Sequence, residues 1–404
     1  MVPNGWETHH LEDLATKISD GIHSTPKYAE KSPVFFVNGN NLKNGKIVIQ
    51  KTTKHVDEND AKKHRKDLND RTILMSINGT IGNLAYYGGE NVVLGKSASY
   101  INVSPSANVD FIYYVLSSAK TQAFFTSELT GSTIKNLSLK TIKLTKIDTP
   151  PLPEQRKIAK ILSTWDKAIS TTEKLIETSK QQKKALMQQL LTGKKRLMNP
   201  ETGKAFEGEW EEVKVAEFGK VVTGNTPPKN DDSNYGSDIS WATAEDFKSK
   251  YVGNTKVKLT KLGASKARIV PKGSVLVTCI ASIGKNAIAY ENITTNQQIN
   301  AVVINNNHCN EFFYYQIEFN KHKLLAWAGT TAVPILNKSS FEKIPLSAPS
   351  KNEQQKITSV LTAADKEIEV LEAKLAHFKQ EKKALMQQLL TGKRRVKLDQ
   401  EVAA

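Results

Sequence analysis

The most regular hydrophobic pattern in the chain lies in two segments, 154–196 and 353–395, where apolar residues recur at alternating intervals of four and three positions. This spacing is typical of an α-helix that packs along a coiled-coil seam. Because one inserted residue would turn the following face by about 100°, the unbroken spacing predicts continuous packed helices rather than loops. The expected seam residues are Ile158, Leu162, Trp165, Ile169, Ile176, Leu186 and Leu190 in the first segment, and Ile357, Leu361, Ile368, Leu371, Leu375, Phe378, Leu385 and Leu389 in the second.

These two segments are also copies of each other at a constant offset of 199 residues. They close on KKALMQQLLTGKKR (183–196) and KKALMQQLLTGKRR (382–395), which differ at one position. Each follows a proline-containing stretch and stops at Thr-Gly, where glycine suits the end of a helix. About 37 helical residues would form a rod of roughly 55 Å. The pattern therefore predicts two equivalent helices that pack together as a scaffold.

The other parts of the chain resemble each other more loosely. Segment 34–47 matches 239–252 in pattern, and ILMSINGTIGNLAYYGGEN (73–91) matches VLVTCIASIGKNAIAYEN (275–292). Short β-branched runs such as ILMSI, VLVTCI and AVVI predict strands. The order of the chain is therefore domain, helix, domain, helix, with divergent domains and nearly copied helices.

The predicted fold class is α+β, with two pseudo-repeated domains that are each followed by a long helix. Within the domains we expect helices at 110–126 and 310–326. The expected boundaries are 1–153 for the first domain, 154–197 for the first helix, 198–214 for a linker, 215–350 for the second domain, 351–396 for the second helix and 397–404 for a tail.

The net charge of +16 over 404 residues favours a polyanionic partner, with nucleic acid as the first expectation and an acidic membrane surface as the rival. The two helical segments carry +10 of this charge. No apolar run approaches the ~18 residues of a membrane span, and the N-terminus lacks a signal-peptide pattern, so we expect a cytoplasmic protein. Two cysteines, Cys279 and Cys309, give neither a disulfide framework nor a four-thiolate zinc site.

Motifs for chemistry are missing from the sequence. It has no GxxxxGK[ST] phosphate loop, no NPPY-type tetrapeptide and no strand-linked GxG pattern suited to adenosylmethionine. The histidines have no spacing typical of metal ligands. We therefore expect no catalytic residue, no metal and no cofactor in this chain, which favours a binding module over an enzyme.

The arrangement resembles the specificity subunit of type I restriction-modification systems. The resemblance rests on helices that open with PLPEQRKIAKIL or SKNEQQKITSVL, on their shared QQLLTGK endings and on the duplicated order, and it covers 6–395. It implies two target recognition domains that each read one half of a bipartite double-stranded DNA sequence, and an antiparallel coiled coil that fixes the gap between the halves. The implied partners are two methyltransferase subunits, which bring S-adenosylmethionine for adenine-N6 methylation, and restriction subunits, which bring ATP and Mg²⁺ for cleavage. The subunit itself is then non-catalytic and prokaryotic.

Residues that contact DNA are sought in loops rich in amides, hydroxyls and lysines, since such groups bond to base edges or phosphates. Similar residues also satisfy backbone groups in turns, which is the competing interpretation. The candidates are Thr25, Lys27, Asn38, Asn40, Asn41, Lys96, Ser97, Ser99 and Thr133 in the first domain, and Thr226, Lys229, Thr243, Glu245, Asn296, Gln297, Gln298, Asn300 and Thr331 in the second.

Two alternatives stay open from the sequence. The chain could be the recognition module of another class of restriction-methylation enzyme, or a basic coiled-coil adaptor that binds a membrane surface or a protein partner. The recognised bases, the gap length and the presence of a restriction subunit are not encoded in any pattern that we can interpret.

Overall fold

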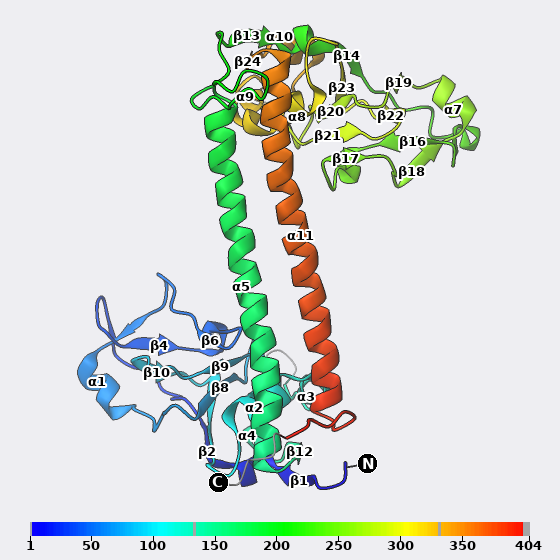
Figure 1. Cartoon of the computed structure of the whole chain (residues 1–404). Coiled ribbons are helices and arrows are strands. Elements are labelled where there is room, and N and C mark those ends of the chain that lie inside the picture. The colour runs from blue at the N-terminus through cyan, green and yellow to red at the C-terminus, as the bar shows by residue number, and fades with distance from the viewer. Residues whose placement is uncertain (1, 132–134, 330–332, 399–404) are drawn as a thin grey trace. The chain divides into compact units, whose positions relative to one another are not determined.

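The computed structural model describes residues 2–131, 135–329 and 333–398 (Figure 1). The two predicted long helices are α5 (Leu152–Leu190) and α11 (Lys351–Leu389). Both end earlier than the predicted segments 154–197 and 351–396, because the chain turns directly after the last leucines.

The chain divides into two compact units, and the division falls inside both long helices. Unit 1 comprises residues up to 173 and from 373 onward, and unit 2 comprises 174–372. Each unit therefore contains one mixed α+β domain, the start of one long helix and the end of the other, which makes the fold class α+β as expected.

Each unit contains two larger sheets, of four strands each in unit 1 and five each in unit 2. The corresponding strands follow the same order, which in the second sheet of unit 2 starts from the opposite edge. In unit 1 the first sheet runs β2 (Ala15–Asp20), β11 (Ala98–Val103), β8 (Thr72–Ser76), β9 (Leu84–Tyr86), and the second runs β10 (Val92–Leu94), β4 (Phe35–Val37), β7 (His55–Val56), β3 (Tyr28–Ala29). In unit 2 the first runs β14 (Gly219–Thr223), β23 (Ile299–Ile304), β20 (Val275–Thr278), β21 (Asn286–Ala289), β17 (Tyr251–Val252), and the second runs β15 (Tyr235–Gly236), β18 (Val257–Leu259), β16 (Ile239–Ala242), β22 (Ile293–Thr295), β19 (Ile269–Val270).

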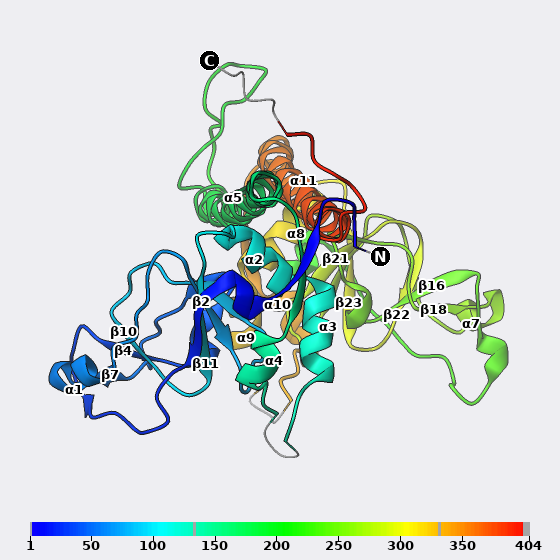
Figure 2. The ribbon, with the colours of Figure 1, turned by 90° about the horizontal axis from the view of Figure 1, so that it is seen from below.

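Further short elements complete each unit. Strand β1 (Glu7–His10) pairs with β12 (Lys146–Thr149), β13 (Glu211–Lys214) pairs with β24 (Pro345–Ala348), and β5 (Leu42–Lys43) pairs with β6 (Lys46–Ile47). The short helices are α1 (Glu58–Lys63), α4 (Leu139–Lys143), α6 (Val215–Phe218), α7 (Lys261–Ser265) and α10 (Lys338–Lys343). In unit 1, α4 packs beside β2 (Figure 2).

The central strands β8 and β20 are buried on both faces, which explains their continuous apolar sequences. Ile73 and Met75 of β8 face the cluster that includes the long helices, whereas Leu74 faces the second sheet. Val275 of β20 joins the corresponding helical cluster of unit 2, and Leu276 faces the second sheet there. The loose sequence repeat is thus a repeat of the whole core.

The prediction of single helices at 110–126 and 310–326 was wrong, since each is two helices. Helix α2 (Val109–Ser117) stops at Ser118, which has extended backbone angles and accepts a hydrogen bond from Thr121 N to its Oγ at 3.3 Å, so that α3 (Ala119–Ser127) starts anew. A serine that caps a backbone N–H competes with helix continuation. In unit 2, α8 (Asn310–Phe319) and α9 (Lys321–Ala326) meet at Asn320.

Within each unit the two long helices run antiparallel along the predicted seam. None of the 15 expected seam residues is exposed, and Ile158, Leu162 and Leu361 have no accessible surface. In unit 1 the rings of Trp165 and Phe378 meet edge to face, with centroids 5.5 Å apart. The alternating spacing of apolar residues therefore corresponds to buried positions along both helices.

The Thr-Gly ends of the helices have a specific backbone and a specific neighbour. Gly193 and Gly392 have φ angles of +69° and +65°, which favour glycine. A Cβ on Gly193 would lie 3.2 Å from the Trp210 ring, and one on Gly392 would lie 3.4 Å from the Trp6 ring. Each domain thus begins with a tryptophan that packs on the end of a long helix in its own unit.

Three ion pairs that join one long helix to the other helix or to the turn directly after it occur twice, at positions related by the offset of 199. In unit 1 they are Glu154 with Arg395 at 2.7 Å, Asp166 with Lys382 at 2.5 Å and Glu173 with Lys379 at 2.7 Å. In unit 2 they are Glu353 with Arg196 at 2.7 Å, Asp365 with Lys183, and Glu372 with Lys180 at 2.6 Å. The repeated sequence therefore encodes a repeated set of antiparallel contacts, and Lys183 and Lys382, at equivalent positions of the repeat, belong to it.

The middle pair also holds the domain of its unit against the helices. Tyr114 of α2 donates a hydrogen bond to Asp166 Oδ2 at 2.7 Å, and Lys382 Nζ lies 5.2 Å from the centroid of the Tyr114 ring. Burial, together with the Asp166 carboxylate, raises the pKa of Tyr114 above its ordinary value. In unit 2, Tyr315 of α8 donates to Asp365 Oδ2 at 2.6 Å in the same way.

The glutamines of the two EQ motifs connect each long helix to its domain. Gln155 Nε2 donates to Pro150 O and its Oε1 accepts from Asn108 N, both at 2.9 Å. In unit 2, Gln354 Nε2 donates to Pro349 O at 2.9 Å, and the same amide lies 3.2 Å from His308 Nδ1. This amide contact requires a neutral imidazole as acceptor.

We expect the stability of unit 2 to fall as the pH drops below about 7, because burial lowers the pKa of His308. An unfolded histidine has a pKa near 6.5, so between this value and the lower folded value the unfolded chain binds more protons. The measurement is thermal unfolding at pH 5.5 and 7.5. His308→Ala, which copies Ala107 at the corresponding position of unit 1, should show a smaller loss over this range, and an equal loss in both proteins would contradict the assignment.

Candidate nucleic-acid interface

The structure brings most of the predicted DNA-contacting residues of each unit into one cluster of three loops. In unit 1 these are the loop after β2 (21–27), the segment around the 3₁₀ turn η2 (Gly39–Asn41), and the turn 95–97 between β10 and β11. In unit 2 the equivalent loops are 224–229, the segment around η4 (Ala244–Asp246) and the turn 296–298.

Hydrogen bonds between these loops fix the cluster in unit 1. Ser97 Oγ donates to Asn38 Oδ1 at 2.9 Å and accepts from Gly39 N at 3.0 Å. The backbones approach closely, since Ile22 N donates to Leu94 O at 2.7 Å and a Cβ on Gly21 would lie 2.2 Å from the same carbonyl oxygen. Glycine is therefore required at the crossing of the three loops.

The cluster in unit 2 uses the same backbone contacts with other side chains. Asn225 N donates to Thr295 O at 2.9 Å, and Thr226 Oγ1 donates to Gln297 Oε1 at 2.5 Å. Thr243 N and Oγ1 both donate to Asp246 Oδ2, at 2.8 and 2.9 Å. The two clusters thus share a frame and present different surfaces.

The predicted residues differ in how accessible they are. Exposed side chains in these loops belong to Thr25, Lys27, Asn40 and Lys96 in unit 1 and to Lys229, Glu245 and Gln297 in unit 2. Partly buried ones belong to Asn38, Ser97, Thr226, Thr243 and Gln298. These are the residues that a ligand on the loop cluster would meet first.

Four predicted residues serve the interior of their domain instead. Ser99 has no accessible surface and donates to Met75 O at 3.0 Å. Asn41 Nδ2 donates to Val48 O at 3.0 Å, and Asn300 Oδ1 accepts from Thr223 Oγ1 at 2.7 Å. Asn296 is 9% exposed, and its Oδ1 accepts from Gln298 N. We remove these four from the candidate surface, because a buried amide or hydroxyl is usually paired within its own domain.

Two of the predicted residues, Thr133 and Thr331, lie outside the described residues. Their contact with DNA stays a prediction.

Sequence reasoning missed two cations beside the clusters, one in each unit. In unit 1, Lys54 lies over the Tyr28 ring, with its Nζ 4.4 Å from the ring centroid, and lines a hollow of about 220 Å³ next to Asn38 and Asn40. In unit 2, Arg268 donates to Thr223 O at 2.7 Å at the edge of the cluster. Both are distant in sequence from the loops that they join, so the only signal available was their positive charge.

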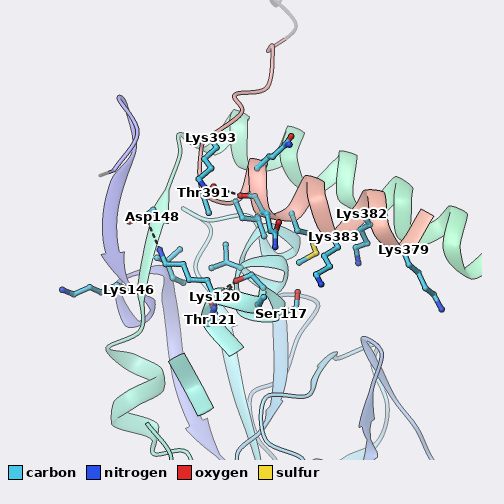
Figure 3. Close-up of a pocket in the computed structure, with 18 residues that line it drawn as sticks. Ser117, Lys120, Thr121, Lys146, Asp148, Lys379, Lys382, Lys383, Thr391 and Lys393 are labelled. Carbon is cyan, nitrogen blue, oxygen red and sulfur yellow. Dashed lines mark hydrogen bonds and ion pairs between the residues drawn. The ribbon is translucent and has the colours of Figure 1, made fainter. Parts of the chain in front are cut away.

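A second basic feature of unit 1 is a groove of about 890 Å³ between the end of α11, the start of α3 and β12 (Figure 3). Lysines from all three elements surround it, and Asp148 lies among them, 3.5 Å from Lys120. The lysines are Lys120, Lys146, Lys379, Lys382, Lys383 and Lys393. Such a groove favours an anionic ligand or an acidic protein surface.

The α11 side of this basic groove is repeated at the end of α5, where the corresponding lysines are Lys180, Lys183, Lys184 and Lys194. In unit 2, Gln316 of α8 donates to Leu191 O at 3.1 Å and to Ser347 O at 2.7 Å. Val115 stands at the Gln316 position in unit 1 and lines the open groove. The lysines are therefore common to both units. The groove beside them lies in unit 1, and in unit 2 Gln316 occupies the position of Val115.

Other kinds of site are not found in the parts of the chain that the structure describes. There, no three or more His, Cys, Asp or Glu side chains are grouped to hold a metal ion. Nor is any helix among these residues long and apolar enough to cross a membrane. Burial raises the pKa of Cys279 to about 11, which keeps this thiol protonated.

This duplicated fold, with two loop clusters on a pair of copied helices, is the fold of specificity subunits of type I restriction-modification systems. The solved S subunit of M. genitalium superposes with a TM-score of 0.62 at 16% identity, covering 96% of this chain and 97% of that one. The HsdS subunit of Thermoanaerobacter tengcongensis gives 0.51 at 16% identity, covering 97% and 98%.

Sequence comparison gives the family. Residues 3–181 and 207–380 match the profile of the Type I restriction modification DNA specificity domain, and the chain belongs to this family. It is 27% identical over 415 residues to a specificity subunit assigned to the type I restriction enzyme MjaX of Methanocaldococcus jannaschii, covering 98% of this chain and 95% of that protein. It is 23% identical over 340 residues to the HindI specificity subunit of Haemophilus influenzae, covering 65% and 74%.

Proposed function

We propose that this chain reads a bipartite DNA sequence for a type I restriction-modification complex, with the loop cluster of each unit contacting one half-site. One observation carries the proposal: the long helices and their ion pairs are copied, whereas the loop clusters share a backbone frame and differ in side chains. Two equivalent helix ends can bind two identical partner subunits, whereas two loop clusters with different side chains can bind two different half-site sequences.

The exposed residues of the clusters fit the chemistry of DNA contact. A side-chain amide such as that of Asn40 or Gln297 can form two hydrogen bonds with the edge of one adenine. A carboxylate such as that of Glu245 can accept a hydrogen bond from the amino group of cytosine. Lys27, Lys96 and Lys229 suit phosphates, which position the protein without reading sequence.

The repeated lysines at the ends of α5 and α11 support docking of two methyltransferase subunits, one at each unit. The cofactors of the assembled complex then reside on partners: S-adenosylmethionine on the methyltransferase, and ATP and Mg²⁺ on restriction subunits. This chain contributes recognition and no bond-breaking group. The relatives come from archaea and bacteria, which supports a place beside chromosomal DNA in a prokaryotic cytoplasm.

The membrane-adaptor alternative has less support. A helix on a membrane surface needs an exposed apolar face. In α5 and α11 the apolar residues line the seam between the helices, and Leu175 and Val370 are the exposed large apolar side chains.

The test is methylation mapping in cells that express the chain with its neighbouring methyltransferase, with and without the gene for this chain. We expect one split motif with a fixed gap to become N6-adenine methylated only when the chain is present. Replacing 11–150 with the equivalent domain of a relative should change one half-site and leave the other unchanged. A methyltransferase that is active in the assembled complex but methylates no split motif would refute the proposal.

Within that assay, Gln297→Ala should relax the choice of base at one position of one half-site, since a good paired contact discriminates by about 1–3 kcal/mol. Asn300→Ala is the matched control, because this neighbouring amide is buried and bonded within the domain. Relaxation by both variants, or by Asn300→Ala alone, would count against Gln297 as a base contact.

A further inference from the structure

Unit 2 buries a lysine in a cage of tyrosines where domain and long helix meet. The Lys250 side chain is 9% exposed, and its Nζ lies 3.1 Å from Glu311 Oε1. The same ammonium donates to Thr362 Oγ1 at 2.8 Å and to Tyr315 Oη at 3.3 Å. The centroids of three tyrosine rings lie 4.8 to 5.8 Å from it, those of Tyr315, Tyr251 and Tyr314. A carboxylate, two hydroxyls and aromatic faces together replace water around this charge.

Unit 1 has the same backbone frame with glycine in the place of this lysine. In unit 2, Ile288 N donates to Lys250 O at 2.8 Å, and in unit 1, Tyr86 N donates to Gly45 O at 3.0 Å. The sequence repeat aligns the same two positions, since 34–47 corresponds to 239–252. Unit 1 therefore lacks the lysine side chain that fills this place in unit 2.

The groups that would surround such a lysine are nevertheless present in unit 1. They line a groove of about 710 Å³ between the β5–β6 turn, α2 and α5, here called the tyrosine groove. Asp110 takes the position of Glu311, and Ser163 takes that of Thr362. Tyr113 and Tyr114 take the positions of the two tyrosines of α8. A third ring comes from Tyr86 of β9, stacked on Tyr113 with centroids 4.4 Å apart.

Three carboxylates and four lysines line the tyrosine groove, and one of these carboxylates, Asp110, forms no ion pair with the described residues. Asp166 pairs with Lys382, and Glu173 pairs with Lys379, as their counterparts do in unit 2. Asp110 shares a hydrogen bond with the Tyr86 hydroxyl, and within the described residues no lysine or arginine forms an ion pair with it. The lysines that line the groove are Lys46, Lys167, Lys379 and Lys382. Lys382, which lies over the Tyr114 ring, does not exclude a second cation there, because in unit 2 both Lys183 and Lys250 lie over the Tyr315 ring.

We propose that the tyrosine groove of unit 1 binds a primary alkylammonium group from outside the chain, held by Asp110, Ser163 and the tyrosine rings as Lys250 is held in unit 2. The group is the end of a lysine side chain of another protein or a free aliphatic diamine, which share this chemistry. The site is separate from the loop cluster and does not rest on DNA recognition.

The test is ¹⁹F NMR of the full chain labelled with 3-fluorotyrosine, titrated with n-butylammonium chloride, which reproduces the lysine side chain from Cβ to Nζ. Signals are assigned by single Tyr→Phe substitutions. We expect saturable shifts for Tyr86, Tyr113 and Tyr114, and at least about tenfold weaker binding in Asp110→Asn. Tyr314 and Tyr315 should not respond until Lys250→Ala vacates their cage, which provides a positive control for the frame.

Sodium chloride at equal ionic strength and n-butanol are the matched probes for charge and for the alkyl chain. Equal shifts with n-butanol would overturn the proposal, because the groove would then bind the alkyl chain without selecting the ammonium. The absence of a saturable shift with n-butylammonium would also overturn it, because the Tyr86 ring would then already fill the place of the lysine. Tighter binding of N-acetyl-lysine-N-methylamide than of n-butylammonium assigns the site to a protein side chain. Tighter binding of 1,4-diaminobutane assigns it to a free diamine.

Discussion

Insertion of seven residues into each long helix is expected to lengthen the unread gap of the methylated motif while leaving both half-sites unchanged. The insertions belong after Leu175 and after Lys374, equivalent positions of the repeat, and duplicate the preceding residues 169–175 and 368–374. Both then continue the alternating three and four spacing, so the seam is preserved.

The size of the effect follows from helix geometry under the proposed function. Seven residues add about 10.5 Å of helix, which equals the rise of about three base pairs. Three base pairs also turn the second half-site by more than a quarter of the ~10.5-base-pair helical turn, so we expect weaker methylation at the longer gap than in the wild type.

The control for this prediction is one alanine inserted after Leu175 alone. It turns the following face by about 100° and removes Ile176, Leu186 and Leu190 from the seam. We expect loss of the folded complex and of all methylation. The measurements are thermal unfolding and methylation mapping; an unchanged gap in a folded, active double-insertion variant would show that helix length does not set the spacing.

The helices were predictable because their pattern is local and periodic. The seam from Ile158 to Leu190, and its copy, follow from the spacing of apolar residues alone. The breaks at Ser118 and Asn320 were not predictable in this way, because the apolar pattern continues through both positions. Each helix ends there because of a capping side chain or a change in backbone angles.

The loop clusters were predictable in outline and not in detail. The repeat placed Asn38 and Thr243, or Lys96 and Gln297, at equivalent sites. The structure adds that their loops meet within each unit, which the sequence did not predict. It also removes residues such as Ser99, because sequence does not tell an amide or hydroxyl that faces solvent from one that completes the bonding of a buried strand. This ambiguity between an exposed and a buried polar side chain is greatest next to strands that are buried on both faces.

The partners of the EQ motif were beyond sequence reasoning, since they lie 157 and 241 positions away. Each copy of the repeat starts with this glutamate and ends with an arginine, and the glutamate of one copy can reach the arginine of the other only if the helices are antiparallel. The sequence showed two ends that differ at one position, and the structure shows that the start of each helix pairs with the residues after the end of the other.

Arg196→Ala is expected to destabilise unit 2 by about 3 kcal/mol, because it leaves the carboxylate of Glu353 buried without its cation. The Glu353 side chain is 1% exposed, and Arg196 Nε and Nη2 each donate to it at 2.7 Å. Arg196 also donates to Gly208 O at 2.8 Å, so the substitution loosens the linker as well. The measurement is urea unfolding, followed by hydrogen exchange at the start of α11.

The same substitution at the other copy should cost less. Arg395 pairs with Glu154 in identical geometry, but its side chain is 45% exposed against 24% for Arg196, so water replaces it more easily. Lys195→Ala and Arg394→Ala, at exposed neighbouring positions, should have little effect. The double variant Arg196→Ala with Glu353→Gln should recover part of the loss, since the uncompensated charge is then removed. If the four single variants lower the free energy of unfolding by the same amount, the ion pairs at the helix ends contribute no more to stability than any surface charge. The repeated glutamate and arginine would then be explained by contacts with partner subunits.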